Sequence, residues 1–275
     1  MDLDDDLIAI VDTIKKIKSD FRKKQPGSGH LREPVPLEPA GVPMSSRDTD
    51  MLHKFACSHP AYLDWQDADL AGVPCRIYQA DINQYWLDST KHDASCQSFY
   101  PTWLLSAYSL SAILDALKFY EIIDVGSGDG RVAYCAGLAG LRACGLEIDG
   151  SLVDLQRQIA VATGVAFDAI RADALLFDYA TLDLKCPAFV ISGLPEMGGE
   201  MLAEGVMTAL SLDSILKEKA CFVLLGKTGR DQDVYGWGST IAKFDLVIDD
   251  IIWLPTYWTA EQERDTPHIL TRFST

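Results

Sequence analysis

The chain has 275 residues, of which 48% are hydrophobic and 23% charged, a composition typical of globular proteins with one large or two small domains. Disorder, collagen-like repeats and coiled coils fit this composition poorly. Lys and Arg number 24 against 40 Asp and Glu, and the net charge of −16 disfavours nucleic acid and anionic membrane surfaces as partners.

Several features of the sequence predict a cytoplasmic protein. It contains no apolar stretch near the roughly 20 residues needed to span a bilayer, and its first residues are acidic where a signal peptide would be basic. The 7 cysteines form no C-x-x-C pair, which favours free thiols in a reducing compartment. The 5 histidines lack metal-ligand spacing, so no metal site is expected.

Residues 1–98 are expected to form a mostly helical accessory or lid region. Apolar residues recur at helical spacing over 4–24, with acidic residues first and basic residues last, an order that complements the helix dipole. A Pro- and Gly-rich stretch then indicates a linker or an extended segment. Residues 47–98 show no strong pattern, and a small, mostly helical segment is predicted there.

Residues 99–275 alternate between strand-like and helix-like patterns. Strands are predicted at 120–125, 141–148, 167–172, 188–192 and 220–226, and helices at 104–117, 131–139, 151–163 and 197–216. Two further strand-like runs, 244–254 and 268–273, have no helix pattern between them. The expected fold is α/β, a doubly wound, Rossmann-like, mostly parallel sheet of seven strands with an antiparallel C-terminal edge hairpin.

The most informative local pattern is DVGSGDGR at residues 124–131, placed directly after a strand and before a helix. Glycines in such a turn let the chain bend sharply and bring a ligand close to backbone N–H groups. A dinucleotide fingerprint would need a third glycine at position 131, where Arg131 stands, so NAD(P) is disfavoured. A purely structural turn is the remaining alternative.

The spacing of this turn resembles motif I of the class I S-adenosylmethionine (SAM) methyltransferases. The resemblance implies that SAM is the cofactor, and that Glu147, 17 residues past Gly130, accepts the ribose hydroxyls. It also implies an adenine contact for Asp173 after the third strand, and a loop beside the methyl group after the fourth. A helix-capping role for Glu147 and an Asx-turn for Asp173 are the structural alternatives. The implied cofactor-binding residues are Tyr100, Thr102, Asp124, Gly126, Ser127, Gly128, Gly130, Glu147, Ile148, Asp173, Ala174, Ser192, Gly193 and Leu194.

A finer resemblance covers residues 99–153. The stretch Tyr100-Pro101-Thr102 before a helix, the Gly-rich turn and GLEID at 145–149 look like the archaeal-type protein-lysine methyltransferases. That resemblance implies that Tyr100 and Thr102 contact SAM; for Tyr100, simple aromatic packing is the alternative. Tyr100 and Glu196 are the candidates for orienting an acceptor amine.

The predicted function is methyl transfer from SAM to an acceptor nitrogen, with protein lysine favoured. Residues 99–275 carry 13 Lys and Arg against 24 Asp and Glu, a charge that can attract a lysine-rich protein surface. The alternatives are a small-molecule methyltransferase and a non-catalytic SAM- or nucleoside-binding module. The loop at 191–196 also lacks the Asn/Asp-Pro-Pro-aromatic pattern of methyltransferases that act on nucleic acid bases.

Overall fold

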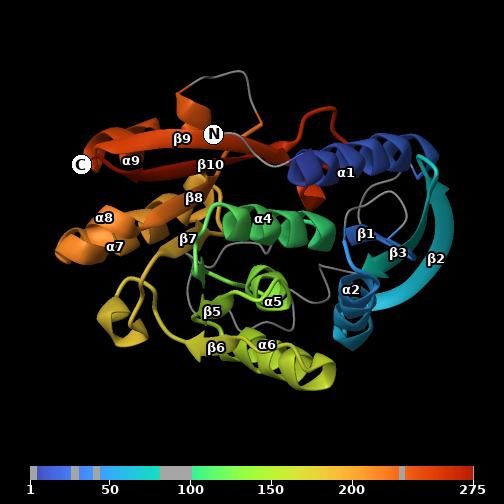
Figure 1. Cartoon of the computed structure of the whole chain (residues 1–275), viewed down its shortest axis with the longest axis horizontal. Coiled ribbons are helices and arrows are strands. Elements are labelled where there is room, and N and C mark those ends of the chain that lie inside the picture. Colours follow the sequence, from blue (N-terminus) through green and yellow to red (C-terminus); the bar gives the residue numbers. More distant parts are fainter. Residues whose placement is uncertain (1–4, 26–30, 40–43, 81–100, 229–232, 275) are drawn as a thin grey trace.

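The computed structural model describes residues 5–25, 31–39, 44–80, 101–228 and 233–274 (Figure 1). Its N-terminal elements are α1 (Asp5–Lys24), β1 (Leu31–Pro36), α2 (Ser46–Ser58), β2 (Tyr62–Leu70) and β3 (Val73–Ala80). The three strands form an antiparallel sheet in the order β1-β3-β2. The boundary predicted at residue 98 lies outside the described residues.

The N-terminal sheet corrects one expectation. The helix expected at 4–24 is present as α1, and α2 adds a second one, but residues 62–80 form a β-hairpin where a mostly helical segment was expected. The two residues of its turn both have positive φ, 56° at Ala71 and 83° at Gly72. Positive φ at both positions is the requirement of a type I′ hairpin turn, whose twist matches that of the two strands. Ala-Gly is a weak sequence signal for that turn, since Asn-Gly or Asp-Gly usually marks it.

The remaining elements form the predicted α/β fold. The strands are β4 (Glu121–Val125), β5 (Arg142–Glu147), β6 (Asp168–Arg171), β7 (Pro187–Ile191), β8 (Cys221–Leu225), β9 (Leu246–Leu254) and β10 (Thr266–Phe273). The helices are α4 (Leu104–Ala116), α5 (Arg131–Leu138), α6 (Gly150–Thr163), α7 (Gly199–Ser211), α8 (Ser214–Lys219) and α9 (Gly238–Lys243), with short 3-10 turns at Tyr179–Leu182, Pro195–Met197, Val234–Gly236 and Tyr257–Thr259.

The seven strands lie in the order β6-β5-β4-β7-β8-β10-β9. Strands β4 to β8 pair in parallel, whereas β10 is antiparallel to both β8 and β9, so the predicted edge hairpin is confirmed. The chain runs outward to one side from β4 and then returns to add β7 on the other side. Ligands of open α/β sheets bind beyond the carboxyl ends of the strands at such a reversal.

Helices cover both faces of this sheet (Figure 1). Successive residues of β4 point to opposite faces: Ile122 packs in the cluster that includes α4, α5 and α6, and Ile123 in the cluster that includes α7. The predicted helix at 197–216 is divided in two, because Asp213 caps a new helix by accepting the N–H groups of Ile215 and Leu216.

The N-terminal region completes the core on the α4 side. Helix α4 is buried on nearly all sides, as its largely apolar sequence requires, since α1 packs against it. Trp103, at the start of α4, is fully buried with its ring edge-on to Phe21 of α1, the ring centroids 5.5 Å apart. No helix within the described residues is long and apolar enough to cross a membrane.

Candidate cofactor and active site

The Gly-rich turn between β4 and α5 has a backbone that only glycine adopts without strain. Gly126, Gly128 and Gly130 have φ of 71°, 56° and 77°, all in the left-handed region. A Cβ at Gly130 would also lie 2.6 Å from Cγ of Gln156. The turn is therefore fixed both by backbone conformation and by close packing against α6.

Glu147, at the end of β5, is buried against this turn. Its Oε2 accepts the Gly128 N–H at 2.9 Å, and its Oε1 accepts the N–H groups of Ile148 and Asp149 at 2.8 and 3.0 Å. Burial raises the pKa of Glu147, and these backbone hydrogen bonds oppose that rise. Glu147 and the motif turn are thus joined directly by a hydrogen bond, a contact that the sequence analysis did not predict.

Asp124, the last but one residue of β4, is joined to the loop after β7. Its Oδ1 accepts the hydroxyl of Ser192 at 2.5 Å, and the side chain is only 1% exposed. Burial raises the pKa of Asp124 to about 7, the charges of Asp129 and Glu147 add to the rise, and the Ser192 hydrogen bond opposes it. Asp124 is therefore shielded from solvent and is influenced by the charges of two other carboxyl groups.

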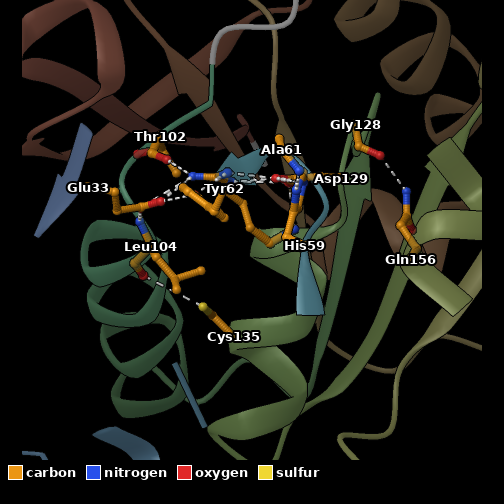
Figure 2. A network of polar contacts seen from close by, with 11 residues as sticks. Glu33, His59, Ala61, Tyr62, Thr102, Leu104, Gly128, Asp129, Cys135 and Gln156 are labelled. Atoms are coloured by element: carbon orange, nitrogen blue, oxygen red, sulfur yellow. Dashed lines mark hydrogen bonds and ion pairs between the residues drawn. The ribbon is translucent and has the colours of Figure 1, made fainter. Parts of the chain in front are cut away.

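Gln156 of α6 holds the turn from the opposite side. Its Nε2 donates to Ser127 Oγ and to the Gly128 carbonyl, both at 2.8 Å. Figure 2 shows this amide beside Gly128. The side chain is fully buried and was not expected from the sequence, where it is one polar residue within an amphipathic helix.

The other predicted cofactor residues lie along the same edge of the sheet. Ala172 N donates to the Glu147 carbonyl and so brings the β6 loop to β5, and Ser192 N donates to the Val125 carbonyl, which brings the β7 loop to β4. Ile148 follows β5 with 46% of its surface exposed. Asp173 Oδ1 accepts the Leu175 N–H at 2.9 Å. This contact forms an Asx-turn, the structural alternative to an adenine contact.

The remaining predicted residues differ in their surroundings. Ala174 is buried, and Gly193 and Leu194 lie partly exposed in the loop after β7. Glu196 is exposed and forms an ion pair with Lys227 from the loop after β8, with 3.2 Å between Oε2 and Nζ. Tyr100 lies outside the described residues.

Thr102 makes two hydrogen bonds, one through its side chain and one through its backbone, to residues far away in the sequence. Its hydroxyl donates to the Pro255 carbonyl at 3.2 Å, and its own carbonyl accepts Arg131 Nη1 at 2.6 Å. Its backbone also pairs with Thr256 as an isolated antiparallel bridge. Thr102 therefore connects the segment before α4 both to the C-terminal hairpin and to the motif.

A buried ionic network that the sequence did not predict surrounds Arg131, the first residue of α5. Figure 2 labels its other members Glu33, His59, Tyr62 and Asp129. Arg131 is 3% exposed, with Nη2 2.6 Å from Asp129 Oδ2 and Nη1 3.3 Å from both carboxylate oxygens of Glu33 on β1. Its Nη2 also donates to the Tyr62 hydroxyl of β2 at 3.3 Å. His59 Nε2 lies 3.2 Å from Asp129 Oδ2.

The charges within this network stabilise one another. Burial alone would raise the pKa of Asp129, but Arg131 and His59 hold it well below its usual value. Burial alone would lower the pKa of Arg131. The neighbouring Asp129, Tyr62 and Glu33 outweigh this effect and hold the pKa well above its usual value. The Tyr62 pKa is raised by burial first and by Glu33 second. Asp129 and Arg131 are thus a charged pair inside the protein.

No protein-family model matches the chain, and no curated protein does. Similar solved structures include a ribosomal protein L11 methylase from Lactobacillus delbrueckii subsp. bulgaricus, at 18% identity and a TM-score of 0.43, covering 62% of this chain and 77% of that one. Magnesium protoporphyrin IX methyltransferase from Synechocystis, with bound SAH, matches at 15% identity and 0.42 over 62% and 83%. A tRNA (uracil-54, C5)-methyltransferase from Pyrococcus abyssi matches at 14% and 0.45 over 64% and 40%. Likeness at this level does not by itself define an activity.

Proposed function

We propose that this chain is a SAM-dependent methyltransferase that transfers the methyl group to an acceptor nitrogen, with protein lysine as the favoured acceptor. The observation that carries the proposal is the buried Glu147 carboxylate bonded to Gly128, within a turn of three left-handed glycines at the carboxyl edge of the sheet. The turn lies where the strand order reverses between β4 and β7. The resemblance of residues 124–131 to motif I supports SAM as the ligand of this turn.

The side chains at the sheet edge where Glu147 lies suit a ligand with a polar ribose and a flat base. Ile148 is 46% exposed, and Leu175 and Leu176 of the loop after β6 are 37% and 84% exposed. Strands β5 and β6 pair in parallel, so these loops leave the sheet at the same edge. Apolar side chains exposed at the same sheet edge as a buried carboxylate support a nucleoside site, because a bound base could cover them.

SAM brings an activated methyl group on a sulfonium, so the protein mainly supplies alignment and exclusion of water. An acceptor lysine must be neutral to attack, and burial beside the cofactor would favour its neutral form. Glu196 and Lys227 meet across the loops after β7 and β8. We propose that the acceptor amine takes the place of Lys227 beside Glu196, and that Glu196 then orients this amine. Tyr100, from the segment before α4, is the second residue proposed to orient it.

Thermal shift tests the cofactor. SAM or S-adenosylhomocysteine should raise Tm and NAD should not, because a ligand that binds only the native state stabilises it. Glu147→Gln keeps the shape of the side chain but lacks one acceptor oxygen, and it should abolish most of the shift. Glu121→Gln is the matched control: Glu121 is also buried and also accepts backbone N–H groups, from Lys185 and Cys186 at the opposite end of β4. Absence of any SAM shift in the unmodified chain would refute the proposed cofactor.

Methyl transfer from labelled SAM into cell lysate tests the acceptor. Label in the protein fraction, recovered as methyl-lysine after hydrolysis, would support the proposal. Label only in small molecules would replace lysine by a small-molecule acceptor. SAM binding without label in any fraction would favour the non-catalytic module, and label in nucleic acid would contradict the charge argument.

A further inference from the structure

We infer that the N-terminal sheet positions the cofactor turn, and that Glu33 is the positioning residue through which it acts. Glu33 lies on β1 and is fully buried, 98 residues before Arg131 in the sequence. This inference rests on the proposed function of the turn and extends it to a part of the chain outside the α/β domain. It assigns a role to the first 80 residues.

The contacts of Glu33 reach both helices that flank the motif strand. One carboxylate oxygen accepts the backbone N–H of Leu104, in the first turn of α4. The other accepts the hydroxyl of Tyr62, and both lie 3.3 Å from Arg131 Nη1 at the start of α5. A single side chain from β1 therefore restrains the starts of α4 and α5 together.

Arg131 transmits this restraint to the turn. Arg131 directly follows Gly130, and Asp129 lies between Gly128 and Gly130. The Arg131 guanidinium donates to Asp129 Oδ2 from Nε at 3.1 Å and from Nη2 at 2.6 Å. The Gly128 N–H is in turn bound by Glu147. Displacement of Arg131 would move Asp129 and, through the backbone, the glycines of the proposed SAM site.

Stability alone is a weak reason for this arrangement. Desolvating two carboxyl groups and a guanidinium is costly, and well-packed apolar residues of similar volume often stabilise a protein as much or more. A planar guanidinium with several fixed partners does restrict geometry. His59 and Phe55 complete the enclosure, with the Arg131 guanidinium carbon 5.9 Å from the centre of the Phe55 ring. The network therefore fits a positioning role better than a purely stabilising one.

The experiment compares Glu33→Gln with Asp265→Asn in the full chain. Asp265 is a matched control because its partly buried ion pair also ties the N-terminal region to the domain: Lys18 Nζ of α1 lies 2.5 Å from its Oδ1, far from the Gly-rich turn in the sequence. Both variants should lower Tm. Only Glu33→Gln should weaken SAM binding, by about tenfold, as expected for loss of one charge-assisted contact.

Hydrogen exchange gives a readout that does not depend on the cofactor. In Glu33→Gln, the backbone amides of residues 126–135 should exchange about tenfold faster without ligand, and in Asp265→Asn they should match the unmodified chain. If the unmodified chain binds no SAM, the proposed function fails while the exchange data still decide the positioning role. Equal SAM affinity and equal exchange in the two variants would overturn the inference.

A milder variant covers the case in which Glu33→Gln does not fold. Tyr62→Phe keeps the ring and removes the hydroxyl shared by Glu33 and Arg131 Nη2. It should shift SAM affinity and exchange at 126–135 in the same direction by a smaller factor. If Glu33→Gln does not fold and Tyr62→Phe changes neither SAM affinity nor exchange at 126–135, the network serves stability only and the positioning role is refuted.

Discussion

Asp124→Asn should remove a loss of stability that the unmodified protein undergoes as the pH rises from about 4 to about 7. The folded-state pKa of Asp124 is raised from 3.8 to about 7. Between these two values the folded protein binds a proton that the unfolded chain has lost, so unfolding becomes easier as pH rises. At 1.36 kcal/mol per pKa unit, the ionised carboxylate costs the folded state about 4 kcal/mol above pH 7, and nothing below pH 4. Asparagine carries no such cost.

The measurement is urea unfolding of both proteins from about pH 5 to about pH 9, with the stability difference taken at each pH. The amide introduced by Asp124→Asn can still accept the Ser192 hydroxyl, and any penalty for its buried NH₂ group is independent of pH, so it cancels from the slope. The free energy of unfolding of the variant, relative to that of the unmodified chain, should increase up to about pH 7 and stay constant above it. A difference that stays constant across this range would refute the raised pKa.

Ser192→Ala supplies the complementary test. The Ser192 hydroxyl donates to Asp124 and lowers its pKa, so removing it should raise that pKa further. The loss of stability would then continue to higher pH than in the unmodified chain. An unchanged profile would mean that Ser192 does not set the ionisation of Asp124.

Three further substitutions test separate parts of the structure by urea unfolding. Gly130→Ala forces a left-handed alanine and a 2.6 Å contact with Gln156, so it should cost about 1–3 kcal/mol and impair SAM binding; full affinity would contradict the assigned turn. Asp213→Ala removes the N-cap of α8 and should cost about 1 kcal/mol with SAM binding intact, and a loss of binding would show coupling that the structure lacks. Phe21→Ala should cost about 3–5 kcal/mol by leaving a cavity beside Trp103, and a cost below about 1 kcal/mol would show that α1 is loosely attached.

Regular periodicity made most of the fold predictable from sequence. The five parallel strands and the antiparallel hairpin lie within a residue or two of their expected positions, because apolar runs of strand length alternate with helical patterns. The hairpin at 62–80 was missed because its turn, Ala71-Gly72, is not a typical signal. The division of the helix at 197–216 depends on the Asp213 side chain, which competes with the helix backbone for N–H groups.

The candidate site was predictable only where it follows local spacing. The Gly-rich turn and Glu147 are separated by a fixed βαβ distance, and the structure brings them into hydrogen-bond contact. Glu33 and Arg131 have no such relation, since 98 residues separate them. One signal was available: Arg131 opens a helix whose other residues, VAYCAGL, are uncharged and mostly apolar, and a charge in such a helix needs a buried partner.

The position of β10 has a consequence for biosynthesis. This strand, residues 266–273, lies between β8 and β9 rather than at the edge, so the sheet has no continuous hydrogen bonding there until residue 273 is available. Lys18 of α1 likewise pairs with Asp265, which is made 247 residues later. Long-range pairing of this kind slows folding and leaves partly folded chains open to aggregation. Until β10 is made, β8 can therefore pair on one side only, and β9 has no partner strand among the described residues.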